Sequence, residues 1–502
     1  MGSMLGSYEI ARSGMYVSER SLIVTGHNLA NATTPGYVRQ QAIIATSRYT
    51  TEGGKFQVGL GAQIEQTRQI RHTFLDAIYR RENTALGYWE TRDKSFQDMQ
   101  TILGDPPMTG VDGDLNIGGL QNVMNQFWDS WHELSKDPSS LTIRALVRQR
   151  SSTLVEQFNH VGKQLDDMQM NLNEEIKVRV NELNDITSQI AKLNVTIMQN
   201  EVNGDHANDF RDQRNLLIDK LSKLANVEVQ EMQGGWTYIT LGGNILVNRG
   251  VSTDIYLDKS TTYAPFYVPK LEGTNTAITF KSGIIKGLLD SRGDEFECPG
   301  SSGASAGLPS DVNKMSVSEM KKLLNNLVLN LATQVNNLHK TGVTMVGTPP
   351  ISGQDFFSTI KGGNLGLSNI KLNDNIMTNL NYIVASKTAA VGDNEVAREM
   401  GNLKHKAMLG STTQNLSPDE YYNSIILQMG TRGQEAATNT NSQNILVQSS
   451  DNSRKKISDV SMDEEMANMM KFQFAYGASS RTINVIDEMV ETVISRMGLV
   501  GR

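Results

Sequence analysis

Apolar residues recur every seven positions near the start of the chain, which is typical of a helix that packs along one face. Residues 8–30 predict an amphipathic helix in which large side chains are each followed, three residues later, by a small one. The large positions are Tyr8, Met15, Leu22 and Leu29, and the small positions are Ala11, Ser18, Thr25 and Ala32. This alternation favours close packing against a second helix.

The end of the chain has the more regular repeat. From Met469 to Met497 the positions are spaced alternately by three and four residues, and Ser479 is the one polar member. The apolar positions are Met469, Phe472, Tyr476, Ile483, Ile486, Val490, Val493 and Met497. Asp463, Glu464 and Glu465 lie near the start, where negative charge suits a helix N-terminus.

We expect this last helix to pack against the N-terminal helix, because each carries an apolar seam with a seven-residue period. Pairing of the two chain ends would nest the rest of the protein between them. The alternative is that each helix packs separately on the body of a globular protein.

The segment LIVTGHNLANATTPGYVRQ, from Leu22 to Gln40, predicts where the first helix ends. Pro35 has no N–H and disfavours a helical conformation at the residue before it. Gly36 can adopt a positive φ, and Asn28 and Asn31 tolerate helix ends and turns. The pattern therefore predicts a helix stop followed by a turn.

The interior begins with strand-like residues 37–70, followed by helices over 72–103 and about 120–135. A 3-4 repeat then runs through residues 158–200, with nine of twelve positions apolar, and predicts a long coiled-coil arm. The exceptions are Gly162, Gln169 and Arg179. A further helix from Asn208 could fold back on this arm.

After this helix, apolar residues recur at every second position. VEVQEM, WTYITL and NILVN are separated by Gly-Gly pairs, which predicts β-hairpins. A flexible linker is expected at 302–311, a helix after it, irregular or β structure over 342–375, and helices with polar interruptions from about 383 to 450.

These elements predict a mixed α and β protein of several nested, discontinuous domains. Residues 1–60 with 455–502 would form a terminal coiled-coil domain, and residues 61–225 with 312–454 a mainly helical, rod-like domain. Residues 226–311 would form a β-rich outer domain inserted into it.

Composition narrows the possible functions. The 502 residues carry a net charge of -7, so no overall basic surface favours nucleic acid. The single cysteine, Cys298, excludes an intramolecular disulfide and a multi-cysteine metal site. No apolar run approaches the roughly 20 residues that span a bilayer, and the N-terminus lacks the pattern of a secretory signal.

Catalytic signatures are also missing. The seven histidines form no H-x-x-x-H or H-E-x-x-H pair, and the chain has neither a phosphate-binding G-x-x-x-x-G-K-[ST] loop nor a G-x-S-x-G elbow. We therefore expect no catalytic, metal-binding or cofactor-binding residues and no enzymatic activity.

Both chain ends resemble the axial proteins of the bacterial flagellum. The first motif matches the rod-and-hook signature of that family at Asn28, Ala30, Asn31, Thr34, Pro35, Gly36 and Tyr37, with Leu29 where isoleucine is frequent. The ending MDEEMANMMKFQFAYGASSRTINVIDEMVETVISRMG is similar to its C-terminal signature. The 158–200 arm and FWDSWHELSKDPSSLTIRALV resemble the hook-associated branch, which joins hook to filament. The similarity covers both termini and most of 1–245, without the large outer insertion of longer members.

The resemblance implies a structural role at the hook–filament junction, needed for filament assembly and swimming motility. It implies an assembly motif of Asn28, Asn31, Pro35, Gly36 and Tyr37, and an axial interface formed by the two apolar seams. The partners would be hook protein, a second junction protein (hook-associated protein 3), further copies in a ring, and a cytoplasmic export chaperone on the C-terminal helix. No nucleic acid or membrane insertion is implied.

The resemblance also implies that the protein lies outside the cell on the flagellum, exported by the flagellar type III apparatus without a cleaved signal peptide. Its ends would be disordered in the monomer and would line an inner tube after assembly. Three alternatives stay open: another axial protein such as hook protein, an enzyme carried on a flagellar scaffold, and a cytoplasmic coiled-coil adaptor.

Overall fold

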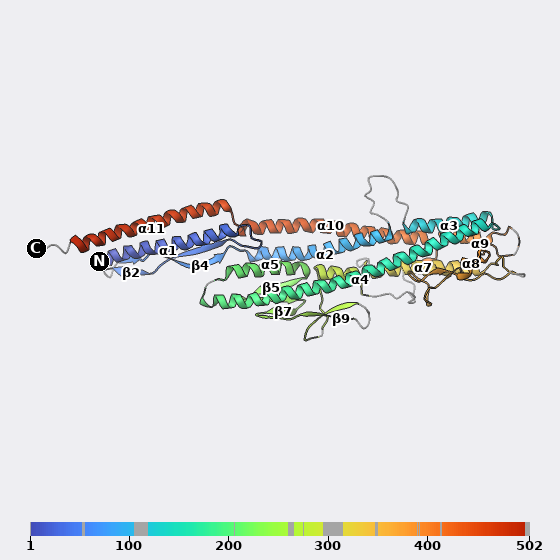
Figure 1. Cartoon of the computed structure of the whole chain (residues 1–502), viewed down its shortest axis with the longest axis horizontal. Helices are drawn as coiled ribbons and strands as arrows, with labels where there is room; N and C mark the ends of the chain where they lie inside the picture. Colours follow the sequence, from blue (N-terminus) through green and yellow to red (C-terminus); the bar gives the residue numbers. More distant parts are fainter. Residues whose placement is uncertain are drawn as a thin grey trace.

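The computed structural model shows an elongated molecule with both chain ends at the same extremity (Figure 1). It describes residues 2–52, 56–104, 119–204, 206–259, 266–274, 276–294, 315–346, 350–388, 390, 392–411 and 414–496. Cys298 and the linker expected at 302–311 lie outside these residues.

The narrow extremity contains a helix pair and a β-hairpin, which we call the terminal unit. Helix α1 (Gly2–Asn31) and helix α11 (Met462–Arg496) lie side by side and run in opposite directions (Figure 1). Strands β1 (Gln40–Thr46) and β4 (Ala62–Gln69) pair antiparallel against α1, and β2 (Tyr49–Glu52) pairs with β3 (Phe56–Gly59). The predicted pairing of the chain ends is confirmed.

The turn after α1 has the predicted cause. Helix α1 ends at Asn31, four residues before Pro35, and the amide of Thr34 donates to the carbonyl of Asn31. Gly36 has a φ of 82°, which only glycine adopts without strain. The chain thereby reverses into β1.

A bundle of long helices forms the body of the molecule. They are α2 (Thr73–Leu103), α3 (Leu120–Lys136), α4 (Leu141–Asn200), α5 (Asn208–Leu224), α6 (Ile284–Arg292), α7 (Val317–Lys340) and α10 (Pro418–Ser458). Helix α4 has 60 residues, a length of roughly 90 Å, and contacts α3, α5, α6 and α7. Helix α10 begins with a capping box between Ser417 and Glu420 and packs along α2.

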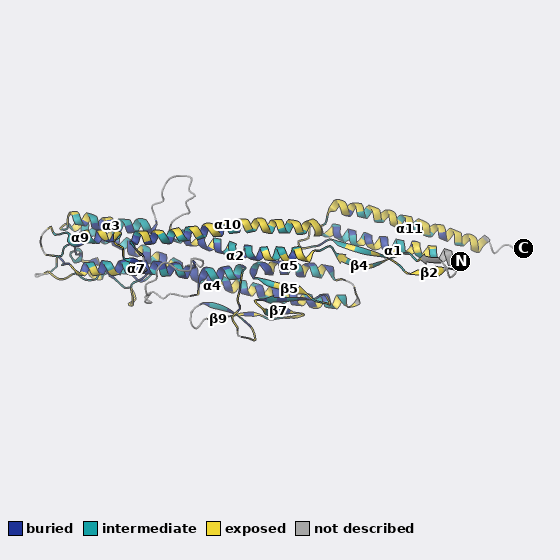
Figure 2. Cartoon of the chain, turned by 180° about the vertical axis from the view of Figure 1, so that it is seen from behind, coloured by how far each residue is buried: buried dark blue, intermediate teal, exposed yellow. Residues whose placement is uncertain are grey.

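A long helix is present over 158–200, as predicted, but it is not a separate coiled-coil arm. Helix α4 begins at Leu141 and packs against other helices of the body (Figure 2). The exceptions to its apolar frame show why. A Cβ on Gly162 would lie 2.1 Å from Ser368 Oγ, so a loop packs directly on this position. Gln169 is buried, and its amide donates to the carbonyl of Arg292 and accepts from the ammonium of Lys321.

The predicted hairpins are present on one side of α4. Strands β5 (Val227–Glu231), β6 (Thr237–Leu241), β7 (Asn244–Asn248) and β8 (Val251–Ser252) form an antiparallel sheet in that order. Both Gly-Gly turns have positive φ angles, as tight hairpins require. Strands β9 (Ile255–Lys259) and β10 (Tyr267–Leu271) form a further antiparallel pair.

Short elements close the far end of the body. They are β11 (Phe357–Ser358), β12 (Lys371–Leu372), α8 (Asp374–Thr378), α9 (Glu395–Asn402), β13 (Leu409–Ser411), β14 (Gln414–Leu416) and 3-10 turns at Leu380–Tyr382 and Leu403–His405. A third 3-10 turn, Glu201–Asn203, lies at the opposite end of the body, between α4 and α5. The expectation of helices alone from about 383 missed the β13–β14 hairpin. Three residues per strand are too few for a visible period of two.

Aromatic residues fill the core at this end, including Trp128, Trp131 and Phe356. His339 is also buried, and burial lowers its pKa to about 4. Its Nδ1 bonds the carbonyl of Gln354 and its Nε2 accepts from the amide of Val384, so the neutral ring joins two loops. The chain is thus a mixed α and β protein of several units. Across the described ranges, no helix combines the length and apolarity needed to cross a membrane.

Candidate assembly site at the terminal helices

The face of α1 that is most buried carries the small residues of its repeat. Ala11, Ser18 and Thr25 are buried, whereas Met15, Leu22 and Leu29 are only partly buried and Tyr8 is exposed. Small side chains let α1 lie close to both α11 and the β1–β4 hairpin. The larger residues of the predicted seam therefore lie at the border of this interface and remain accessible.

The predicted seam residues of α11 are buried to different extents. Ile486 is 4% exposed, Met469, Phe472, Ile483 and Val490 are partly buried, and Tyr476 and Val493 are exposed. Met497 lies outside the described residues. Ser479, the polar exception, marks a close approach, since a Cβ on Gly14 of α1 would lie 3.0 Å from its Oγ.

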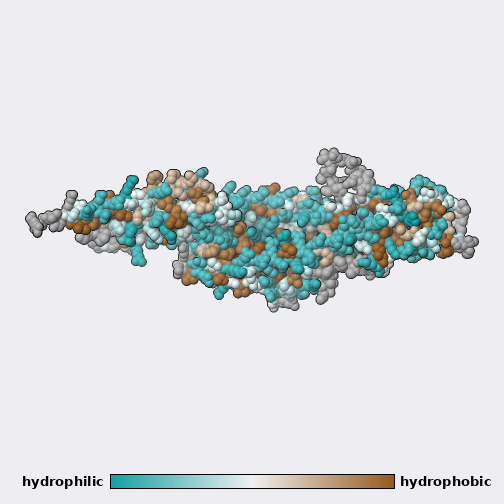
Figure 3. Space-filling view, viewed as in Figure 1, coloured by the Kyte–Doolittle hydropathy of each residue, from teal (hydrophilic) through white to brown (hydrophobic). Residues whose placement is uncertain are grey.

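A second apolar face on α11 was missed by the sequence reasoning. Met466, Met470, Phe474, Val485 and Met489 are all exposed, and Phe474 is 78% exposed. Met470, Phe474 and Val485 lie about half a turn from the seam and point away from α1, whereas Met466 and Met489 flank the seam, three residues from Met469 and Ile486. Hydrophobic residues are visible along this part of the molecule (Figure 3). The signal in the sequence was the four-residue spacing of Met466, Met470 and Phe474.

Asn28 links the first helix to the other parts of the terminal unit. Its Oδ1 accepts from the Tyr37 hydroxyl at 2.8 Å and from the Gln40 amide at 2.9 Å. Its Nδ2 donates to the Gln40 carbonyl at 2.9 Å and to Glu465 Oε2 at 3.1 Å. All four hydrogen-bonding positions of this amide are used, and the side chain is 1% exposed.

The other residues of the predicted motif shape the turn. The Asn31 amide donates to the carbonyl of His27, and its Oδ1 accepts from the Thr34 hydroxyl. Pro35 and Gly36 are exposed, and the Tyr37 hydroxyl also bonds Nδ1 of His27. The structure thus brings these residues together around the end of α1.

Glu465 lies in the first turn of α11, as predicted, and has a further role there. It is 2% exposed and accepts from Asn28 and from Nε of Arg39 at 2.7 Å, and Glu464 accepts from the same guanidinium at 2.8 Å. The sequence predicted these carboxylates at the helix N-terminus but gave no sign that Arg39 binds them. Their partners are more than 400 residues away in the chain, so no local pattern could identify them.

Buried ionisable groups surround this junction. Burial and the nearby carboxylates Asp209, Asp212 and Glu465 raise the pKa of Tyr37, so its hydroxyl keeps the proton that it donates to Asn28. Burial raises the pKa of Asp212 to about 7, against the opposing effects of the Val38 amide and Arg71. Asp212 Oδ2 accepts from that amide at 3.0 Å, and Arg71 lies 3.6 Å from Oδ1.

The described side chains of the terminal unit offer packing surfaces. Within the described ranges of the chain, no three histidine, cysteine, aspartate or glutamate residues cluster as metal ligands. An open cavity of about 1170 Å³ between α2, α4 and α5 is lined by mixed charges such as Lys94, Glu175 and Arg179, without histidine or cysteine. The site is therefore interpreted as an assembly surface.

Comparison with known proteins defines the class first. Residues 456–497, which include α11, match the family model described as the C-terminal part of flagellar basal body rod FlgEFG proteins. Residues 111–357 match the helical domain of flagellar hook-associated protein FlgK. The chain is a structural protein of the flagellar axis.

Full-length similarity defines the family. The chain is 32% identical to flagellar hook-associated protein 1 of Bacillus subtilis, with 100% of both chains covered. It is 23% identical to the Escherichia coli protein of that name over 82% of this chain and 70% of the other, and 25% identical to the Salmonella typhimurium protein over 69% and 58%. The chain belongs to the flagellar hook-associated protein 1 family.

A solved structure shares the fold. The hook junction protein FlgK of Burkholderia pseudomallei superposes with a TM-score of 0.59 at 14% identity, covering 76% of this chain and 100% of that one.

We predict that Asn28→Ala lowers the stability of the terminal unit by at least about 2 kcal/mol. The substitution removes the hydrogen bonds that Asn28 makes to the backbone of Gln40 and to Glu465 Oε2. Amide exchange in the first turns of α11 and at Gln40 should accelerate. Asn31→Ala is the matched control, because its amide bonds only within the helix end and turn. Equal exchange rates in the two variants would contradict a special role for Asn28.

We predict that stability falls as pH rises toward about 7, because the raised pKa of Asp212 means that the folded state holds a proton that the unfolded state has released. Each tenfold difference in proton affinity between the two states changes the free energy of unfolding by about 1.4 kcal/mol. Asp212→Asn should remove this loss in urea unfolding measured between about pH 4 and 8. Asp98→Asn, an exposed carboxylate on α2, should keep the wild-type slope. A parallel pH dependence in Asp212→Asn would show that the group is ionised throughout.

Proposed function

We propose that this protein forms the junction between the flagellar hook and filament and is required for filament assembly and swimming. The observation that carries the proposal is the paired terminal helices, whose apolar residues are only partly covered within one chain. Because burial of apolar surface gains about 25 cal/mol per Å², the faces left open favour association with further subunits. The protein acts by assembly and not by catalysis.

Two faces of α11 make different contacts in the proposed assembly. The seam around Ile486 contacts α1 of the same chain, and the face of Met466, Met470 and Phe474 is free for a neighbour. We propose that residues 1–60 with 455–502 line an inner tube, that 61–225 with 312–454 form the rod-like body, and that 226–311 form an outer domain. Copies of the chain form a ring that contacts hook protein on one side and hook-associated protein 3 on the other.

Export without a cleaved signal, through the flagellar type III apparatus, fits the proposed place outside the cell. We infer that the terminal helices are disordered while the chain is exported, because their apolar faces have no partner until the chain folds and assembles. Neighbouring subunits would supply the missing contacts.

Antibody labelling of detached flagella by electron microscopy tests the junction role. We expect a narrow band where the curved hook meets the filament. Label along the whole hook would indicate a hook protein, and label confined to the cytoplasm would indicate an adaptor.

Ile486→Asp with Val490→Asp should abolish that band and the filament, because two charges enter the helix interface. The purified variant should remain soluble with a folded body, as measured by circular dichroism. Asp replacement of the exposed α11 residues Gln473 and Thr482 serves as the control. Normal filaments on cells carrying the double seam variant would overturn the role of the seam.

We also propose that a cytoplasmic export chaperone covers the exposed methionine face of α11, since flexible methionine side chains adapt to a partner surface. Pull-down of the chaperone from cell extract should succeed with the full chain and fail with a chain truncated after Ser461. Equal recovery with both chains would place the chaperone elsewhere.

A further inference from the structure

The connection between the terminal unit and the body is narrow. The chain passes between them at two places, Ile70–His72 before α2 and Asp459–Ser461 between α10 and α11. Arg39 sits at the second crossing, where its backbone amide donates to the carbonyl of Ser458 while its side chain binds Glu464 and Glu465. Arg39 therefore holds the last turn of α10 and the first turn of α11 at one point.

Elsewhere the joint is held mainly by polar contacts from the start of α5. We call His206, Asn208, Asp209 and Asp212 the α5 latch. Asp212 accepts from the Val38 amide, Asp209 accepts from the Gln40 side chain at 2.8 Å, and Asn208 donates to the Thr67 carbonyl at 3.0 Å. The Gln69 side chain donates to the Asn208 carbonyl, and His206 bonds Gln66 at 2.9 Å.

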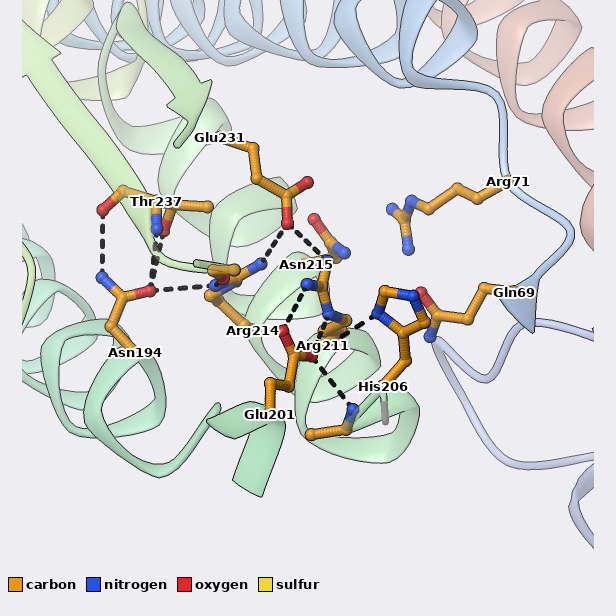
Figure 4. A network of polar contacts seen from close by, with 12 residues as sticks. Gln69, Arg71, Asn194, Glu201, His206, Arg211, Arg214, Asn215, Glu231 and Thr237 are labelled. Atoms are coloured by element: carbon orange, nitrogen blue, oxygen red, sulfur yellow. Dashed lines mark hydrogen bonds and ion pairs between the residues drawn. The ribbon is translucent and has the colours of Figure 1, made fainter. Parts of the chain in front are cut away.

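The α5 latch is fixed firmly on the body side. Glu201 accepts two hydrogen bonds from the guanidinium of Arg211 and one from the backbone amide of Ala207 (Figure 4). One helical turn later, Arg214 is 1% exposed and donates to Asn194 of α4. Gln69 and Arg71 approach this network from the terminal unit. The weak side of the joint is therefore the side that faces β1 and β4.

Open space surrounds the joint. A cavity of about 410 Å³ separates the turn at residues 32–38 from α2, α5 and the end of α10. A second cavity of about 250 Å³ lies beside Gln40, His206 and Asp209, so water can reach the outer part of the α5 latch, whereas Asn208 and Asp212 are buried. The hydrogen bonds of His206 and Asp209 can be exchanged for bonds to water and therefore cost little to break. Leu216 of α5 lies close to Gly36, where an added Cβ would be 3.2 Å from its Cβ.

We propose that the joint is a hinge about Arg39, and that the α5 latch holds it at the angle seen in this structure. Release of the latch lets the terminal unit tilt into the cavity while α1, α11 and the β1–β4 hairpin move as one piece. The physical basis is the contrast between extensive packing inside each unit and a small set of polar bonds between them, of which those of His206 and Asp209 can be exchanged for bonds to water. This inference does not depend on the junction role.

Spin-label distances in the full chain test the hinge. One label is placed at Arg48→Cys on the hairpin and the other at Lys192→Cys on α4, both exposed positions, with Cys298→Ser removing the single native thiol. With the latch intact we expect one narrow distance population, with any second population below roughly 10%. Adding Asn208→Ala, Asp209→Ala and Asp212→Ala should make a second distance the major one.

Two comparisons keep the result interpretable. Gln213→Ala with Lys220→Ala changes exposed residues of the same helix and should leave the narrow population unchanged. Gln40→Ala with Gln69→Ala removes two of the five latch contacts from the terminal side without altering α5 and should increase the population of the second distance. An unchanged narrow distance in both latch variants would overturn the hinge, and so would an equally broad distribution in the protein with its latch intact.

Discussion

The terminal unit depends on the side-chain amide of Asn28. One buried amide bonds the turn through Tyr37, strand β1 through both backbone groups of Gln40, and the start of α11 through Glu465. A buried amide that lost any of these partners would carry the cost of an unsatisfied polar group. The register of α1 against β1 and α11 is therefore fixed at one position, and the small residues along α1 allow the close packing that follows from it.

The body is specified differently, by a closed core along α4 and by buried cations that bind carbonyl oxygens. Arg144 donates to the carbonyls of Pro138 and Ile383, and Arg292 donates to that of Tyr267. Burial lowers the pKa of both guanidinium groups. Such groups join loops to helices with defined geometry. The core of the body is thus closed within one chain, whereas the terminal helices leave apolar faces exposed, as expected of a subunit that assembles through its ends.

Several elements could be predicted from the sequence because their cause is local. The end of α1 follows from Pro35 and Gly36, the hairpins follow from paired glycines, and the long helices follow from the 3-4 repeat. The candidate site was predicted in part: Asn28 and Tyr37 were found through a motif, and the seam was found through its period. Arg39, Asp209 and Asp212 were not found, because each acts on a partner far away in sequence. The exposed methionine face could not be predicted, because the 3-4 spacing of the seam is the stronger pattern on α11 and the four-residue spacing of Met466, Met470 and Phe474 is short.

The helices, the turn and the seam periods can be read from local sequence, since they arise from backbone preferences and from residues within one or two turns of each other. The sequence by itself also indicated which chain ends pair, because two matching repeats had no other partner nearby. The packing of α4 against α3, α5, α6 and α7, in place of a free arm, became visible in the folded chain. The tertiary structure also decided that Glu465 is buried, and that the two units meet through the polar contacts of α5. The physical reason is that burial and hydrogen bonding across hundreds of residues depend on which surfaces meet, and no local pattern encodes that choice.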